Sequence, residues 1–170
     1  MRRLPILTRV MLIALTACAP AQPASKLGPS PTTPMRTPTP QPANDEDAIR
    51  QLITSEGQGV VSQDIAGLMD LWAPDAVITD AKHTPDDPND DARWNGRDAI
   101  RERYVVLVFP GNPTSAGAAD VKLEIQGDRA NAVSTTAIGT EVAPGGDHWT
   151  FAKRDGRWWI AGLTYNLEPK

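Results

Sequence analysis

The stretch that decides the fold is HWTFAKRDGRWWIAGLTYNL, residues 148–167, near the C-terminus. Apolar and polar residues alternate on both sides of Asp155-Gly156, as they do in strands with one buried face. An Asp-Gly pair between two such runs is a strong signal for a tight hairpin turn. The stretch therefore predicts two antiparallel strands, 148–153 and 157–167.

Further strands and then helices are predicted when the sequence is read outward from this hairpin. Alternating runs at 121–126 and 129–139 flank Gly127-Asp128, and Val77-Ile78-Thr79 predicts a short earlier strand. Helical spacing of apolar residues predicts three helices, over 45–61 with an irregularity at Gly57 and Gly59, over 64–72, and from 96 to Pro110. Residues 82–95 are polar and predict an irregular loop. Helices followed by antiparallel strands indicate an α+β fold, in which a curved sheet wraps over the helices.

The N-terminus has the pattern of an export signal. Arg2 and Arg3 precede VMLIALTA, eight uncharged residues that are too few to cross a membrane and typical of a signal peptide. LTAC, which ends at Cys18, resembles the bacterial lipobox. That resemblance implies cleavage after residue 17, acylation of Cys18 with chains such as palmitate, and an extracytoplasmic domain anchored to the cell envelope. A plain secretory signal, cut near Ala21 or Ala24, is the alternative.

Residues 18–43 form a proline-rich segment between this signal and a domain at 44–170. Eight of the 16 prolines lie between Ala19 and Ala43. Such a segment predicts an extended spacer that rises about 3 Å per residue, and so reaches about 70 Å. Proline-rich segments also serve as docking ligands, which is the other interpretation.

The domain is strongly acidic. All 21 acidic residues lie in 44–170 with 12 of the 17 basic ones, so its formal charge is −9. A surface of this sign repels nucleic acid and anionic lipid headgroups, and we expect neither as a partner. Cys18 is the one cysteine of the chain, so no intrachain disulfide can form and core burial has to stabilise the domain.

Four stretches resemble one superfamily in order and spacing. DEDAIRQLI, DIAGLMDLWAPDAVITD, NGRDAIRERY and the hairpin at 148–167 are similar to the nuclear transport factor 2-like, or SnoaL-like, domains. The resemblance implies a cone, in which a strongly bent sheet closes on helices and leaves an apolar pocket at the wide end. The superfamily includes ketosteroid isomerase-like and polyketide cyclase-like enzymes, kinase association domains and binding modules, so the fold does not specify an activity.

The resemblance also implies which side chains face the pocket. Alternation along the last strand places Trp158, Thr164 and Asn166 on the inner face, and the opposite set on the outer face. The predicted pocket residues are Trp72, Trp94, Tyr104, Trp149, Trp158, Thr164 and Asn166. The outer set, Trp159, Leu163 and Tyr165, predicts a homodimer interface, unless the spacer or the long loop covers it.

A non-catalytic module that binds a small apolar or polar ligand is the favoured function. The closest branch of the family carries a run of His and Ser on its last strand, and here residues 162–166 contain no histidine. The alternative is a small acid–base enzyme, of isomerase, cyclase or hydrolase type, in which Asp80 and His148 converge on the pocket. A lone strand-end aspartate is more often simply solvated. A third possibility is an assembly role through the outer sheet face.

No cofactor is predicted. The sequence lacks nucleotide-binding and nucleophile-elbow motifs, and two histidines with one committed cysteine do not suit a zinc site. His83 lies in the polar loop and is expected to be exposed. That loop contains a weak calcium-binding pattern with Ala92 in place of the usual glycine. Its candidate ligands are Asp87, Asn89, Asp91 and Asp98.

Overall fold

The structure is a computed structural model that describes residues 42–117, 120–138 and 141–169. The predicted signal peptide, Cys18 and nearly all of the proline-rich segment lie outside the described residues. Within those residues, no helix combines the length and the apolar character that crossing a bilayer requires.

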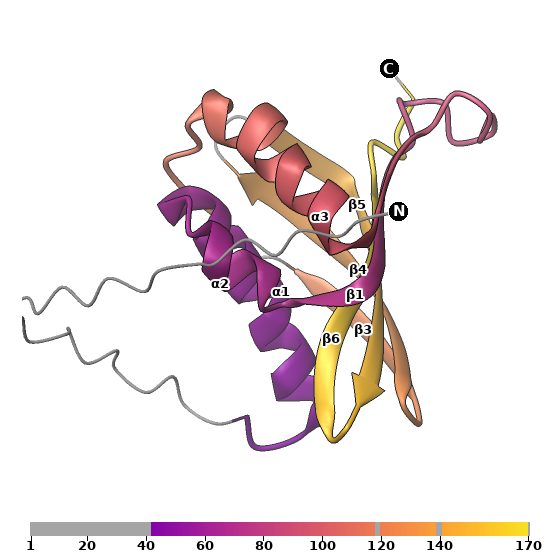
Figure 1. The fold of residues 1–170 in the computed structure, drawn as a ribbon. Coiled ribbons are helices and arrows are strands. Elements are labelled where there is room, and N and C mark those ends of the chain that lie inside the picture. Colours follow the sequence, from indigo (N-terminus) through magenta and orange to yellow (C-terminus); the bar gives the residue numbers. More distant parts are fainter. Residues whose placement is uncertain (1–41, 118–119, 139–140, 170) are drawn as a thin grey trace, which may run out of the picture. The chain divides into compact units, whose positions relative to one another are not determined.

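Six strands of the described chain form one curved sheet in the order β2-β1-β6-β5-β4-β3. Neighbouring strands are antiparallel, except that β1 and β6 run parallel. The helices cover one face of the sheet, as Figure 1 shows. This arrangement confirms the predicted α+β class. The strands are β1 (Trp72–Asp80), β2 (Ala92–Asn95), β3 (Val121–Gln126), β4 (Arg129–Ile138), β5 (Glu141–Arg154) and β6 (Arg157–Tyr165).

The first two helices each begin at a capping side chain. The side chain of Asn44 caps α1 (Asp45–Ser62) by accepting a hydrogen bond from the Asp47 N–H at 2.9 Å. Asp64 caps the short α2 (Ile65–Met69) in the same way. Helix α3 (Gly96–Arg103) continues into a π-helical turn, Tyr104–Val108, and then a 3-10 turn, Phe109–Gly111.

The predicted irregularity at Gly57 and Gly59 is absent, because α1 runs through both residues. The glycines serve close packing instead. A Cβ atom at Gly59 would lie 2.9 Å from side-chain carbons of Leu68, so α2 approaches α1 closely only because this side chain is missing.

Two boundaries differ from the prediction because sheet pairing competes with local helical pattern. Helix α2 ends at Met69, and Trp72 starts β1 instead of ending a helix. The Ile160 N–H donates to the Leu71 carbonyl at 2.9 Å, which ties this segment to β6. The loop predicted over 82–95 contains β2, where Trp94 pairs with Ile78.

A β-bulge at Ala161 divides β6 into two halves, and the alternation of inward and outward side chains shifts by one residue between them. Phe151 pairs with Ile160 and the preceding Thr150 pairs with Gly162, so Ala161 is the additional residue. Simple alternation holds before it, where Trp158 and Ile160 are buried, and shifts by one residue after it, where Leu163 is buried. The predicted faces of residues 163–165 are therefore reversed, and Asn166 lies beyond the end of β6.

The core lies between the helices and the concave face of the sheet. Helices α1 and α3 contact β6 and β1 respectively. The fully buried apolar side chains at the centre are Ile49, Leu68, Trp72, Ile78, Ile100 and Ile160.

Candidate functional site

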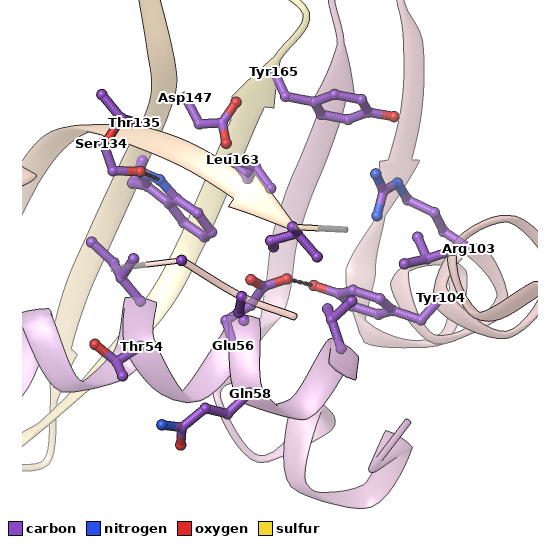
Figure 2. A pocket seen from close by; sticks show the side chains of 18 residues that line it. Thr54, Glu56, Gln58, Arg103, Tyr104, Ser134, Thr135, Asp147, Leu163 and Tyr165 are labelled. Atoms are coloured by element: carbon purple, nitrogen blue, oxygen red, sulfur yellow. Dashed lines mark hydrogen bonds between the residues drawn. The ribbon is translucent and has the colours of Figure 1, made fainter. Parts of the chain in front are cut away.

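A cavity of about 400 Å³ lies between α1, the π-helical turn and the inner face of β4, β5 and β6 (Figure 2). Its walls combine apolar side chains with polar groups contributed by several elements. The polar lining residues are Thr54, Glu56, Gln58, Arg103, Tyr104, Ser134, Thr135, Asp147 and Tyr165, and the apolar ones are Ile53, Gly57, Val60, Val108, Ala116, Gly117, Ile138, Trp149 and Leu163.

Glu56 and Tyr104 form a buried hydrogen-bonded pair in the cavity wall. Glu56 projects from α1 and is 6 % exposed, while Tyr104 is 1 % exposed. The Tyr104 hydroxyl donates to Glu56 Oε1 at 2.7 Å (Figure 2). Burial, and then the neighbouring Glu56 carboxylate, raises the pKa of Tyr104 well above its ordinary value of 10.0. Tyr104 is therefore a neutral donor throughout the physiological range.

A second buried carboxylate, Asp147, enters the cavity from the sheet. It pairs in register with Ser134 across β4 and β5, and both residues are nearly inaccessible to solvent. Ser134 Oγ accepts a hydrogen bond from Trp149 Nε1 at 2.7 Å. Figure 2 shows Asp147 on the wall opposite Glu56. Two carboxylates from different elements thus share one cavity.

Arg103 supplies the cationic side chain among the described lining residues. Its guanidinium lies 4.8 Å from the ring centroid of Tyr165, 5.2 Å from that of Trp94 and 5.7 Å from that of Tyr104. Its Nε atom is buried without a hydrogen-bond partner. The guanidinium thus lies against three aromatic rings at one end of the cavity.

Two of the seven predicted pocket residues, Tyr104 and Trp149, line this cavity. Trp72 and Trp158 are core residues, and Trp94 packs against the guanidinium of Arg103. The remaining two, Thr164 and Asn166, do not line it. Thr164 pairs with the exposed His148 and lies on the outer face as a result of the bulge, and Asn166 donates to Asp80 Oδ1 at 2.7 Å.

The predicted dimer surface is divided between the two faces of the sheet. Leu163 and Tyr165 line the cavity, contrary to prediction, because the bulge turns them inward. Trp159 remains partly exposed and packs against Arg157, whose guanidinium carbon lies 4.1 Å from the ring centroid, and Arg97. The homodimer itself stays a prediction.

Asp80 and His148 do not converge on the cavity. Burial raises the pKa of Asp80, but hydrogen bonds from Asn166 and the Lys82 backbone outweigh it, so the net shift is downward. A general base would need the opposite shift to act near neutral pH. His148 is exposed on the outer face of β5. The structure therefore gives no support to this acid–base pair.

The acidic loop does not gather its predicted calcium ligands. Asp87 accepts hydrogen bonds from Asn89, and Asp91 forms an ion pair with Arg93 at 3.0 Å. In the described part of the chain, no group of three or more His, Cys, Asp or Glu side chains is placed to hold a metal ion, and Asp98 belongs to no such group. His83, expected to be exposed, is half-buried, with Nδ1 2.8 Å from the Glu168 carbonyl oxygen.

The polar groups of the cavity, except Tyr104, were missed from the sequence. Glu56 had a readable signal, since it lies on the apolar stripe of α1 formed by Ile49, Leu52, Ile53 and Val60. A charged residue at such a position is buried, and needs a partner. Ser134 and Asp147 carried no comparable signal, because strand register alone brings them together.

Comparison with known proteins agrees with this fold. Three of the solved structures that share the fold are each less than 25 % identical in sequence. The nuclear transport factor 2-like protein with a cystatin-like fold from Novosphingobium aromaticivorans is 20 % identical, with a TM-score of 0.51 over 71 % of this chain and 79 % of that one. The hexachlorocyclohexane dehydrochlorinase LinA-type3 from Novosphingobium barchaimii is 17 % identical, with a TM-score of 0.54 over 70 % and 83 %. A nuclear transport factor 2-like protein of unknown function from Shewanella baltica is 16 % identical, with a TM-score of 0.53 over 71 % and 90 %.

No protein of curated function matches the chain in sequence. The family model of the SnoaL-like domain, by contrast, matches residues 41–164, which is most of the chain and runs from just before α1 to one residue before the end of β6. The chain therefore belongs to the family of SnoaL-like domains.

Proposed function

We propose that this protein is a lipid-anchored, extracytoplasmic binding module whose SnoaL-like domain holds a small organic ligand in the cavity. The cavity carries the proposal. At about 400 Å³ it falls within the usual range for small-molecule sites, and it combines apolar side chains with polar groups that come from several elements. The absence of histidine from its described lining agrees with a binding role.

The binding role can be tested by filling the cavity. In Gly57→Leu the new side chain grows from a position where Cβ already meets Ala116 Cβ at 3.3 Å, beside the cavity. We expect native mass spectrometry of the full-length chain, in a non-ionic detergent, to show a bound small molecule that Gly57→Leu loses. Gly111→Leu is the matched control, since nothing lies within 4 Å of a Cβ there. Equal retention of the molecule by both variants would place it outside the cavity.

The acid–base enzyme remains the alternative, carried by different residues from those expected. Glu56, hydrogen-bonded to Tyr104, and Asp147 on the opposite wall are the titratable groups that share the cavity. If the molecule recovered in the preceding experiment is converted by the wild-type protein and not by Glu56→Gln, the function is catalytic. A molecule recovered unchanged from both supports binding alone.

The anchor is supported by sequence, through the LTAC motif that ends at the single cysteine. Cys18→Ser removes the thiol that would carry the lipid. We expect the wild-type chain, expressed in a bacterium, to sediment with membranes, and Cys18→Ser to lose that association and the mass of the acyl chains. A single acyl chain binds membranes marginally, whereas several anchor durably, so the change should be nearly complete. Membrane association that survives the substitution would contradict lipid anchoring at this residue.

A further inference from the structure

We propose that the cavity selects organic cations, meaning small molecules that carry an ammonium group on an apolar body. The inference rests on the proposed function, because it names the class of ligand for the same cavity. The arrangement that carries it is the pair of buried carboxylates, Glu56 and Asp147, on opposite walls of one aromatic-lined space.

The described lining is negative. Glu56 and Asp147 contribute two carboxylates, 6 % and 5 % exposed, against the single guanidinium of Arg103. Like charges that share a buried space raise the free energy of the folded state, and a cation placed between them lowers it. A cationic ligand therefore complements this space better than a neutral or an anionic one.

Arg103 does not cancel this preference, since its position is set by aromatic rings. The guanidinium carbon lies within 6 Å of three ring centroids, those of Trp94, Tyr104 and Tyr165. Figure 2 shows it beside the two tyrosines at one end of the cavity, away from Asp147. An anion drawn to Arg103 would still meet the two carboxylates, whereas an ammonium group could bind toward Asp147.

The rest of the cavity suits an apolar body attached to the charge. Aliphatic side chains of α1, the π-helical turn and β6 face the space, and the indole of Trp149 forms part of the sheet wall. Aromatic faces attract ammonium groups as well as rings. The formal charge of −9 on residues 44–170 adds a long-range field that raises the local concentration of cations.

Three probes of matched shape and different charge test the inference: benzylamine, benzyl alcohol and benzoate. Calorimetry on the full-length chain in a non-ionic detergent at pH 7, where benzylamine is cationic, should show benzylamine binding at least about tenfold more tightly than benzyl alcohol, and benzoate weakest. If benzyl alcohol or benzoate binds as tightly as benzylamine, cation selection is overturned while the proposed binding function stands. If none of the three binds at millimolar concentration, cation selection is overturned as well, and the comparison of Gly57→Leu with Gly111→Leu decides the binding function separately.

Charge-neutral variants locate the selectivity. We expect Glu56→Gln and Asp147→Asn each to weaken benzylamine binding by about tenfold and to change benzyl alcohol binding by less than about twofold. Glu102→Gln, which neutralises an exposed carboxylate next to Arg103 outside the cavity lining, should change neither. Unchanged benzylamine affinity in both cavity variants would overturn the assignment. The wild-type probe comparison keeps the inference falsifiable if a variant does not fold.

Discussion

Replacing Trp72 by alanine is expected to lower the free energy of unfolding by about 3–5 kcal/mol, the range for a buried large aromatic side chain. Trp72 is fully buried at the start of β1. Its ring centroid lies 6.4 Å from those of both Tyr104 and Trp149, so it packs behind two residues that line the cavity. Its removal leaves a void that the surrounding sheet and helices cannot close without moving Tyr104 and Trp149.

Urea denaturation of the full-length chain, followed by circular dichroism, measures this loss. Trp159→Ala is the matched control, since the same side chain is removed from the outer face, where its contacts include the guanidinium groups of Arg97 and Arg157. A partly exposed tryptophan in cation–π contact should contribute about 1–2 kcal/mol. Equal losses of unfolding free energy in the two variants would contradict the prediction that the buried Trp72 stabilises the fold more than the partly exposed Trp159.

Alkaline pH is expected to destabilise the fold through Tyr104. The folded-state pKa of this phenol is raised well above the ordinary 10.0, mainly by burial and then by Glu56. Above pH 10 the unfolded chain loses the proton and the folded chain keeps it. The unfolded state then binds fewer protons, so stability falls as the pH rises. The contribution is complete below pH 10 and declines above it by up to about 1.4 kcal/mol per pH unit.

Denaturation midpoints between pH 9 and 11.5 test this dependence. Tyr104→Phe should be less stable at neutral pH by about 1–3 kcal/mol, because Glu56 loses a buried donor, and should lack the Tyr104 part of the alkaline slope. Tyr165→Phe removes the other tyrosine hydroxyl and leaves Tyr104 in place, so it is the matched control. Parallel pH profiles for the parent and Tyr104→Phe would contradict the shift.

Local pattern predicted the class of fold and most of the strands. Alternation in β3 to β6, with Gly127 and the pair Asp155-Gly156 at the hairpin turns, was readable because these residues adopt positive φ, which glycine and aspartate tolerate. Local pattern gave the wrong structure for Trp72, which fits an apolar helical pattern but starts β1, where it pairs with Ile160. Pairing partners distant in sequence leave no local trace.

The cavity was predicted as a feature of the family and not in its residues. One additional residue at Ala161 reversed the faces of everything after it, so Leu163 and Tyr165 became lining residues and Thr164 became an outer one. Side chains along a strand alternate with a period of two residues, so a shift by one position moves a side chain to the opposite face of the sheet. The titratable groups that line the cavity are Glu56 and Asp147, and the predicted Asp80 and His148 do not line it. Burial and strand register decide which titratable groups meet, and residue type alone does not.

The sequence by itself determined the α+β class, where the first two helices begin and the acidic charge of the domain, since each depends on residues close together in the chain or on composition alone. It also carries the motif at Cys18 on which the anchor is proposed. The tertiary structure alone decided where β6 bulges, that Glu56 meets Tyr104, and that Asp147 faces the same cavity. These contacts join residues far apart in sequence, and their formation depends on the packing of α1, α3 and the sheet around the buried rings of Trp72 and Trp149.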